Sequence, residues 1–318
     1  MERTYTRREF GAYTLGMGLA GGAMASLSSP AEAAEADYET DAAGVPRPAD
    51  ADELRSALAD ASEHSLVECR SGTFRPGATL TIPDYVRLDA TGVTFVPRHD
   101  DAVFSLGARG RLLNGTIQLG SSGGTGVLND SSVGDSYAHK WGAVPVGTRI
   151  TAESGSDATG YQVLRATDGG NSFYHNPVFA TDGVDTPLYL DNPSENGFIT
   201  SVNTRLVARD FVNAVVAESP NGISNNYTVC DLTPGSNTES VTVTDADYGR
   251  RNCAEGTFGD ASKYDQIVWI QSTRQFDSDS YGGNHVHLSY DGYSSRRSPE
   301  LVRDDTPAND TYVVDFSQ

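Results

Sequence analysis

The sequence predicts an all-β protein of the solenoid type, in which short strands stack as successive coils behind one N-terminal helix. Three observations predict this fold. The chain holds a single stretch with helical periodicity, a long succession of short apolar pieces separated by Gly, Pro and Asp, and a weak internal repeat. None of the apolar pieces is long enough for a helix, and such dense turn signals are typical of all-β folds.

The one helix is expected in residues 50–64, "DADELRSALADASEH". Its apolar positions recur at helical spacing: Leu54, Ala57, Leu58 and Ala61. Asp50 or Asp52 stands where a side chain can accept hydrogen bonds from the first free N–H groups of the helix. The stretch therefore predicts an amphipathic helix with one apolar face to bury.

The apolar pieces that follow are expected to be strands: 66–67, 79–82, 86–88, 93–96, 103–106, 112–119, 149–150 and 161–164. Later in the chain Asn203, Asn226 and Asn252 each precede a strand-like piece, at spacings of 23 and 26 residues. Repeats of this length are typical of solenoids, where asparagines at equivalent turns can form a ladder between coils. The repeat favours a solenoid over a sandwich or a barrel.

The stretch "LVECRSGTFRPGATLTIPDYVRLDATGVTFV" after the helix resembles the opening of pectate-lyase-like proteins. In that family a capping helix and a "GT-F" turn precede a "L-x-I-P-x-x-V-x-L" coil. The resemblance implies a right-handed parallel β-helix over residues 50–292 with about ten coils. Residues 293–318 match no part of that family and are expected to be a C-terminal cover or tail, because an exposed coil end would template aggregation. Residues 121–195 match no part of that family and are expected to be further coils with large loops.

The N-terminus resembles a twin-arginine (Tat) export signal. Arg7 and Arg8 precede a short, Gly-rich apolar stretch and Ala-x-Ala sequences, so residues 1–36 are expected to be a removable signal and 37–49 a flexible acidic lead-in. No cysteine follows the apolar stretch, and no run is long enough to span a membrane. The sequence therefore predicts an extracellular or cell-surface protein without a membrane span.

The chain is strongly acidic, with a net charge of −20 and only two lysines beside 21 arginines. Such a surface suits molar salt, where the Debye length is about 3 Å and self-repulsion is suppressed, so an extreme halophile is inferred as the source. The same charge argues against nucleic-acid binding, which needs basic patches.

Cys69, Cys230 and Cys253 show no Cys-x-x-Cys spacing, so the sequence does not favour a zinc or iron–sulfur site. Two interpretations remain open for them. Cys230 and Cys253 could form a disulfide in an exported protein, or the cysteines are buried and free.

The resemblance implies a long face of parallel strands that binds an extended polysaccharide or a cell-surface glycan. Cleavage by a glycoside hydrolase would need clustered carboxylates, and cleavage by a lyase would need a base together with Ca²⁺ or arginine. The candidate groups are spaced two apart or lie beside such a pair: Asp245, Asp247, Arg250, Asp277 and Asp279. With 29 aspartates in the chain, solvated surface acids are the competing interpretation of each pair.

His285 and His287 in "GGNHVHLSYDG" complete the candidate set. Alternation with Val286 and Leu288 predicts a strand whose imidazoles share one face, about 6–7 Å apart. Because the apolar residues must take the buried face, the histidines are expected on the solvent side. A metal site would need a third ligand from a neighbouring coil, and Asp277 and Asp279 are the nearest in sequence.

Two function classes follow from these features. One is an exported β-helix that binds, and as an enzyme would cleave, a polysaccharide. The other is a non-catalytic surface, adhesin or virus-appendage-like β-helix, which would be an oligomer such as a trimer. Carboxylates that converge on one face would favour the first class, and an exposed apolar strip the second.

The export signal can be tested directly. Replacing both arginines (Arg7→Lys, Arg8→Lys) should leave an unprocessed precursor in the cytoplasm, because the Tat pathway recognises the arginine pair. Immunoblots of cell and medium fractions measure the distribution. Unchanged export of the variant would contradict the Tat interpretation.

Overall fold

The computed structural model describes the following residues of the 318-residue chain: 38–121, 123–130, 143–164, 172–175, 177–191, 199–202, 204–219, 227–246, 253–258, 268–271, 285–291, 302–304 and 311–317. The structural statements that follow concern these residues, which all belong to one compact unit, residues 36–318.

The described chain is a parallel β-helix, as predicted. Its 13-stranded sheet contains β1 (Leu66–Glu68), β4 (Arg87–Asp89), β7 (Arg111–Leu113), β10 (Val144–Thr151), β13 (Val178–Asp182), β16 (Thr204–Arg209), β18 (Tyr227–Thr233), β20 (Cys253–Phe258), β22 (His285–Asp291) and β24 (Thr311–Ser317), with β2 (Gly72–Phe74), β5 (Val93–Phe95) and β8 (Thr116–Gln118) off this path. The nine-stranded sheet contains β3 (Leu80–Ile82), β6 (Phe104–Leu106), β9 (Gly124–Asp130), β11 (Ala158–Leu164), β14 (Thr186–Asp191), β17 (Asn213–Ser219), β19 (Ser240–Ala246), β21 (Val268–Gln271) and β23 (Val302–Asp304). β12 (Ser172–His175) and β15 (Ile199–Val202) form a separate pair.

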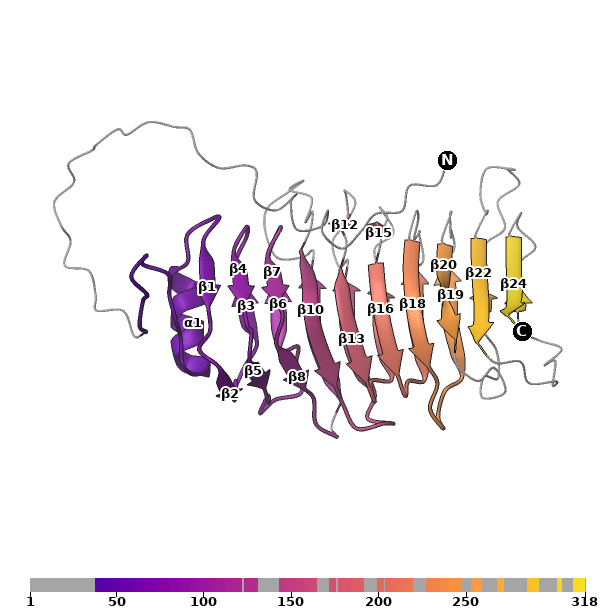
Figure 1. Cartoon of the computed structure of the whole chain (residues 1–318), viewed down its shortest axis with the longest axis horizontal. Helices are drawn as coiled ribbons and strands as arrows, with labels where there is room; N and C mark the ends of the chain where they lie inside the picture. The colour runs from indigo at the N-terminus through magenta and orange to yellow at the C-terminus, as the bar shows by residue number, and fades with distance from the viewer. Residues whose placement is uncertain are drawn as a thin grey trace, which may run out of the picture. The chain divides into compact units, whose positions relative to one another are not determined.

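The topology distinguishes this fold from a sandwich. From β10 onward the chain alternates between the two large sheets, and each strand pairs in parallel with strands of the coils before and after it. The strands on the main path of the 13-stranded sheet, from β1 through β10 to β24, consequently lie side by side in one row (Figure 1). The main path of the 13-stranded sheet has ten strands, which agrees with the expected number of coils.

The core is built from inward rows of apolar side chains that continue from coil to coil. Phe74, Phe95 and Ile117 are consecutive register partners, and all three are fully buried. The Phe95 ring makes edge-to-face contacts with Phe74 at 5.6 Å and with Phe104 at 4.8 Å between ring centroids. This aromatic cluster joins both sheets inside the first coils.

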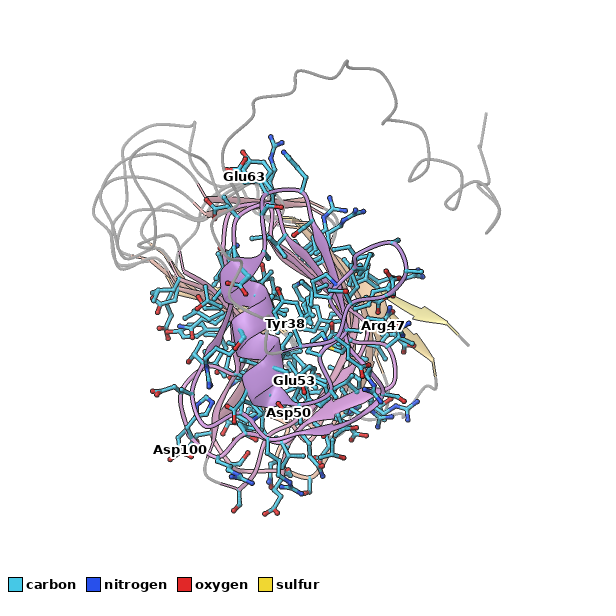
Figure 2. All side chains as sticks on the ribbon, turned by 90° about the vertical axis from the view of Figure 1, so that its left-hand side faces the viewer. Tyr38, Arg47, Asp50, Glu53, Glu63 and Asp100 are labelled. Atoms are coloured by element: carbon cyan, nitrogen blue, oxygen red, sulfur yellow. The ribbon has the colours of Figure 1, made fainter. Side chains whose placement is uncertain are left out.

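The N-terminal helix α1 (Ala51–Asp60) covers the open end of this core. Its side chains Leu54, Ala57 and Leu58 are buried, and Figure 2 shows the helix lying across the first coil. The Asp50 carboxylate accepts hydrogen bonds from the N–H groups of Asp52 and Glu53, both at 2.9 Å, so Asp50 rather than Asp52 is the cap.

Three local expectations need correction. The helix ends at Asp60, before the expected residue 64, because the chain turns through Ser62–Ser65 and His64 has a φ of 65°. The expected strand 112–119 is two strands, β7 and β8, because Asn114 and Gly115 both have positive φ. The short strand β2 was not expected.

Two further expectations concern the later coils. In 293–318, where we expected a cover, β23 and β24 pair in parallel with β21 and β22 and continue the two sheets. Asn203, Asn226 and Asn252 lie outside the described residues. The residues that follow the last two, Tyr227 and Cys253, are register partners of each other.

The aromatic cluster should dominate the stability of the first coils. Phe95→Ala is expected to lower the free energy of unfolding by about 3–5 kcal/mol, because it leaves a cavity between Phe74 and Phe104. Phe95→Leu fills most of that space and should cost clearly less. Urea titrations followed by circular dichroism measure both, and equal costs would contradict the packing described.

Candidate functional site

Three acidic residues occupy one register row of the nine-stranded sheet. In β14, Leu188 and Leu190 are buried, so the alternating Tyr189 and Asp191 face outward and are half-buried. Register pairs Asp191 with Glu218 of β17, which is exposed, and pairs Glu218 in turn with Asp245 of β19. These three residues, here called the acidic row, occupy the same position in three successive coils.

Hydrogen bonds connect the acidic row to its neighbours. The Tyr189 hydroxyl donates to Oε2 of Glu218 at 2.5 Å, and Nε2 of Gln162 donates to Oδ2 of Asp191 at 3.3 Å. The Thr125 hydroxyl donates to Oε1 of Gln162 at 3.4 Å. The network therefore spans β9, β11, β14 and β17, and it fixes both carboxylates on a rigid sheet rather than on loops.

The environment of Asp191 favours its protonated form. Burial is the largest cause that raises the pKa of Asp191, the negative charge of Glu218 adds to it, and the hydrogen bond from Gln162 acts in the opposite direction. The pKa of Tyr189 is raised as well, by burial first and then by the hydrogen bond to Glu218 and the charges of Asp191 and Glu218. Tyr189 consequently remains a hydroxyl donor.

This arrangement can carry out acid–base chemistry. A carboxyl group with a raised pKa can deliver a proton, and a neighbouring carboxylate can act as a base or a nucleophile. Parallel strands lie about 4.8 Å apart, which is close to the separation of about 5–5.5 Å between the two carboxyl groups of retaining glycoside hydrolases. An aromatic residue beside the pair suits the apolar face of a sugar ring.

One predicted candidate, Asp245, is the register partner of Glu218, an acid of the preceding coil rather than of the same strand. His285 and His287 lie in β22 of the 13-stranded sheet, whereas Asp245 lies in the nine-stranded sheet. The two groups of candidates are therefore not on one sheet. Four further candidates lie outside the described residues: Asp247, Arg250, Asp277 and Asp279.

The register of β22 bears on the histidine pair. His287 pairs with Glu255 of β20, Glu255 with Val229 of β18, and Val229 with Arg205 of β16, whose side chain is exposed. His287 thus occupies the same row as an outward-facing residue. The solvent-side position of the imidazoles remains a prediction.

Sequence reasoning missed Tyr189, Asp191 and Glu218 because it paired acids along a strand. The signal that could have found them is the spacing between coils. Asp191, Glu218 and Asp245 follow one another at intervals of 27 residues, each at the end of a β-branched or apolar piece. Equal intervals of this length predict equivalent positions in successive coils.

The cysteines play no part in this site. Cys69 and Cys230 are free and buried, so the disulfide between Cys230 and Cys253 is not formed. Burial, with a smaller effect from the neighbouring aspartates Asp89 and Asp231, raises the pKa of each thiol to about 12. Thiols in this environment are inert packing groups.

Within the described residues, no group of three or more His, Cys, Asp or Glu side chains is arranged to hold a metal ion. The only helix in that part of the chain is not long and apolar enough to cross a membrane. Comparison of the chain with protein-family models, with curated proteins and with solved structures finds no match.

Asp191→Asn is expected to stabilise the protein at neutral pH. The unfolded chain releases the proton of Asp191 near pH 4, the ordinary pKa of an aspartate, to within about half a unit. Because folding raises the pKa of Asp191, the native state keeps this proton to a higher pH. Stability therefore falls as the pH rises through the folded pKa, and the cost persists at neutral pH. Asparagine cannot ionise and removes that cost.

The measurement is the thermal midpoint of parent and variant between about pH 4 and pH 8. The variant should melt higher at pH 7 and converge with the parent near the acid end. Asp182→Asn is the control, because it breaks the 2.9 Å ion pair with Arg149 and should bring no gain. A lower midpoint for Asp191→Asn at pH 7 would contradict the described environment.

Proposed function

We propose that this protein binds an extended polysaccharide along the outer face of the nine-stranded sheet and hydrolyses it at the acidic row. The observation that carries this proposal is the register pairing of Asp191 with Glu218, together with the raised pKa of Asp191. A glycoside hydrolase needs two neighbouring carboxyl groups in different environments, one as the acid and one as the base or nucleophile.

The roles follow from the two environments. Asp191 is the general acid, because burial and the charge of Glu218 favour its protonated form. Glu218 acts as the base or the nucleophile, and the Tyr189 hydroxyl orients its side chain through the 2.5 Å hydrogen bond. Gln162 holds Asp191 in place from the preceding coil.

Binding along the strand row has its own support. Tyr189, Val216, Val243 and Trp269 are consecutive register partners on β14, β17, β19 and β21. In this row Tyr189 and Trp269 stand three strand steps apart, about 14 Å along the stack, a spacing that corresponds to separate sugar units of one bound chain. A straight polymer suits a row of parallel strands better than a small ligand does.

The setting of this activity is also a proposal. The twin-arginine stretch supports export, the resemblance to pectate-lyase-like proteins supports a polysaccharide ligand, and the net charge of −20 supports a halophilic source. The alternative, a non-catalytic appendage, would favour an apolar strip for subunit contacts. Among the side chains whose burial is described, Val178 is the only large hydrophobic one that is exposed, at 36%.

The test is release of reducing ends from a panel of alginate, polygalacturonate, xylan and dextran in molar NaCl. Asp191→Asn and Glu218→Gln should each lower the rate by about 100-fold or more while leaving polymer binding intact, because each removes one proton-transfer or nucleophilic group. Asp182→Asn is the matched control, since it removes a carboxylate from the other sheet.

The products separate hydrolysis from a lyase reaction. Hydrolysis gives saturated ends, whereas β-elimination gives an unsaturated uronate that absorbs in the ultraviolet. No cleavage of any polymer by the parent protein, or full activity in both variants, would show that the proposal is wrong.

A further inference from the structure

Three residues other than glycine adopt left-handed backbone geometry at equivalent turns of the first three coils. His64, Tyr85 and Arg109 have φ values of 65°, 63° and 56°. Each stands two residues before a strand of the 13-stranded sheet, namely β1, β4 and β7. Glycine would adopt this geometry without strain, whereas each of these residues costs about 1–2 kcal/mol. The chain thus keeps three side chains at positions where the backbone disfavours them.

The three side chains stack on one another. The rings of His64 and Tyr85 lie 4.9 Å apart between centroids, and the guanidinium carbon of Arg109 lies 5.3 Å from the Tyr85 centroid. The second distance is within the range of a cation–π contact. The stack therefore holds the charged end of Arg109 in a defined place.

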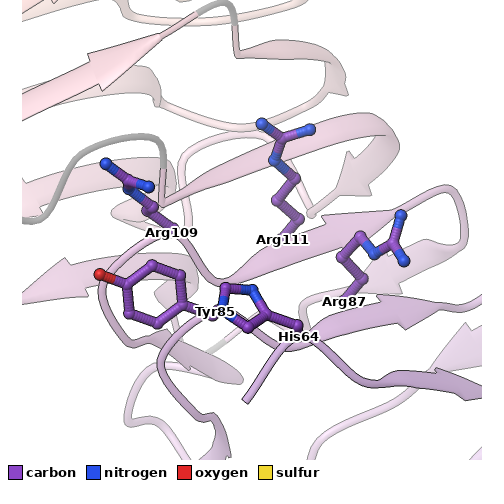
Figure 3. Close-up of a pocket in the computed structure, with 5 residues that line it drawn as sticks. All are labelled: His64, Tyr85, Arg87, Arg109 and Arg111. Atoms are coloured by element: carbon purple, nitrogen blue, oxygen red, sulfur yellow. The ribbon is translucent and has the colours of Figure 1, made fainter. Parts of the chain in front are cut away.

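Two more arginines complete a basic pocket. Arg87 and Arg111 are register partners on β4 and β7, and both are exposed. With His64, Tyr85 and Arg109 they line a pocket of about 230 Å³ (Figure 3). Three arginine side chains consequently line one small space, two of them from strands about 4.8 Å apart, and Figure 3 shows their guanidinium groups at separate points of its rim.

The arginines of this pocket form no recorded ion pair with the described part of the protein. The ion pairs recorded there involve Arg55, Arg70 and Arg149 instead. In the register row, Arg87 and Arg111 stand between Leu66 and Val144, which carry no charge.

Three acids flank the pocket along the chain. Glu63, next to His64, is exposed and belongs to none of the recorded ion pairs, whereas Asp84 and Asp89 accept hydrogen bonds within their own turns. Oδ1 of Asp89, two residues beyond Arg87, accepts hydrogen bonds from Thr91 and Asn114, and Oδ1 of Asp84 accepts one from the N–H of Ala108. Burial tends to raise the pKa of Asp89, but these hydrogen bonds outweigh it and lower the pKa. The Asp89 carboxylate therefore stabilises the turn that follows β4 and forms no recorded ion pair with Arg87.

We propose that this pocket binds a carboxylate or sulfate group. Guanidinium groups match planar or tetrahedral oxyanions through paired hydrogen bonds, and an anion over this pocket would bring together positive charges that otherwise repel each other. The volume suits a single acidic sugar or a single pendant group. A nucleic acid would instead need a basic stripe that follows many phosphates. The site lies on the other sheet from the acidic row, so it goes beyond the proposed hydrolysis and does not depend on it.

The experiment measures binding to the full-length chain by isothermal titration calorimetry at one fixed NaCl concentration. The probes are sodium sulfate, D-glucuronate and dextran sulfate, with glucose and neutral dextran as uncharged counterparts. The pocket variant is Arg87→Gln with Arg111→Gln. The matched control is Arg75→Gln with Arg98→Gln, which removes the same charge from exposed arginines on the first two coils outside the pocket. Circular dichroism verifies that both variants fold.

The pocket variant should lose about ten- to hundred-fold in affinity for the anionic probes, and the control pair should lose less than about three-fold. Binding of sulfate and glucuronate themselves would identify a free small anion as sufficient. Binding of dextran sulfate alone would identify a group carried on a polymer. No binding of any anionic probe, equal binding of neutral dextran, or an equal loss in the control pair would overturn the proposal.

Discussion

Parallel stacking in register is the constraint on which the rest of this structure depends. Each strand pairs residue by residue with strands of the coils before and after it, so a side chain's neighbours are set by coil length rather than by local sequence. Rows of buried residues such as Phe74, Phe95 and Ile117 then form one continuous core. No single coil could bury these residues alone, and the helix α1 covers the end where stacking stops.

The same constraint places like charges side by side, which lowers the stability of the fold. Asp191 and Glu218 are adjacent on one row, and Arg87 and Arg111 are adjacent on another. Like charges directly across a strand pair are destabilising, and a coil one residue longer or shorter would separate them. The coil lengths nevertheless keep both like-charged pairs in register. Each pair lies beside an aromatic residue, Tyr189 for the acids and Tyr85 for the arginines. Retained unfavourable pairs of this kind are typical of binding and catalytic sites.

Elements that depend on neighbouring residues in the chain could be predicted from the sequence, whereas features that depend on contacts between coils could not. The apolar face of α1 and most strands between residues 66 and 106 follow from spacing and turn residues within a few positions. The split between β7 and β8 depends on the left-handed backbone of Asn114, and residue type does not fix that geometry. The acidic row depends on 27-residue intervals between coils, which no strand pattern contains. The stack of His64, Tyr85 and Arg109 was beyond sequence reasoning because it needs three unusual φ angles at once.

A strongly acidic protein can bind an anion in the proposed pocket when concentrated salt screens the repulsion between them. At about 0.1 M ionic strength the Debye length is about 10 Å, so a net charge of −20 would repel an acidic ligand well before contact. In molar salt that length shrinks to about 3 Å, and only groups in direct contact still interact. Recognition then depends on short hydrogen bonds from fixed guanidinium groups rather than on long-range attraction. The strained turns and stacked rings that fix Arg109 supply the order that such short-range recognition needs.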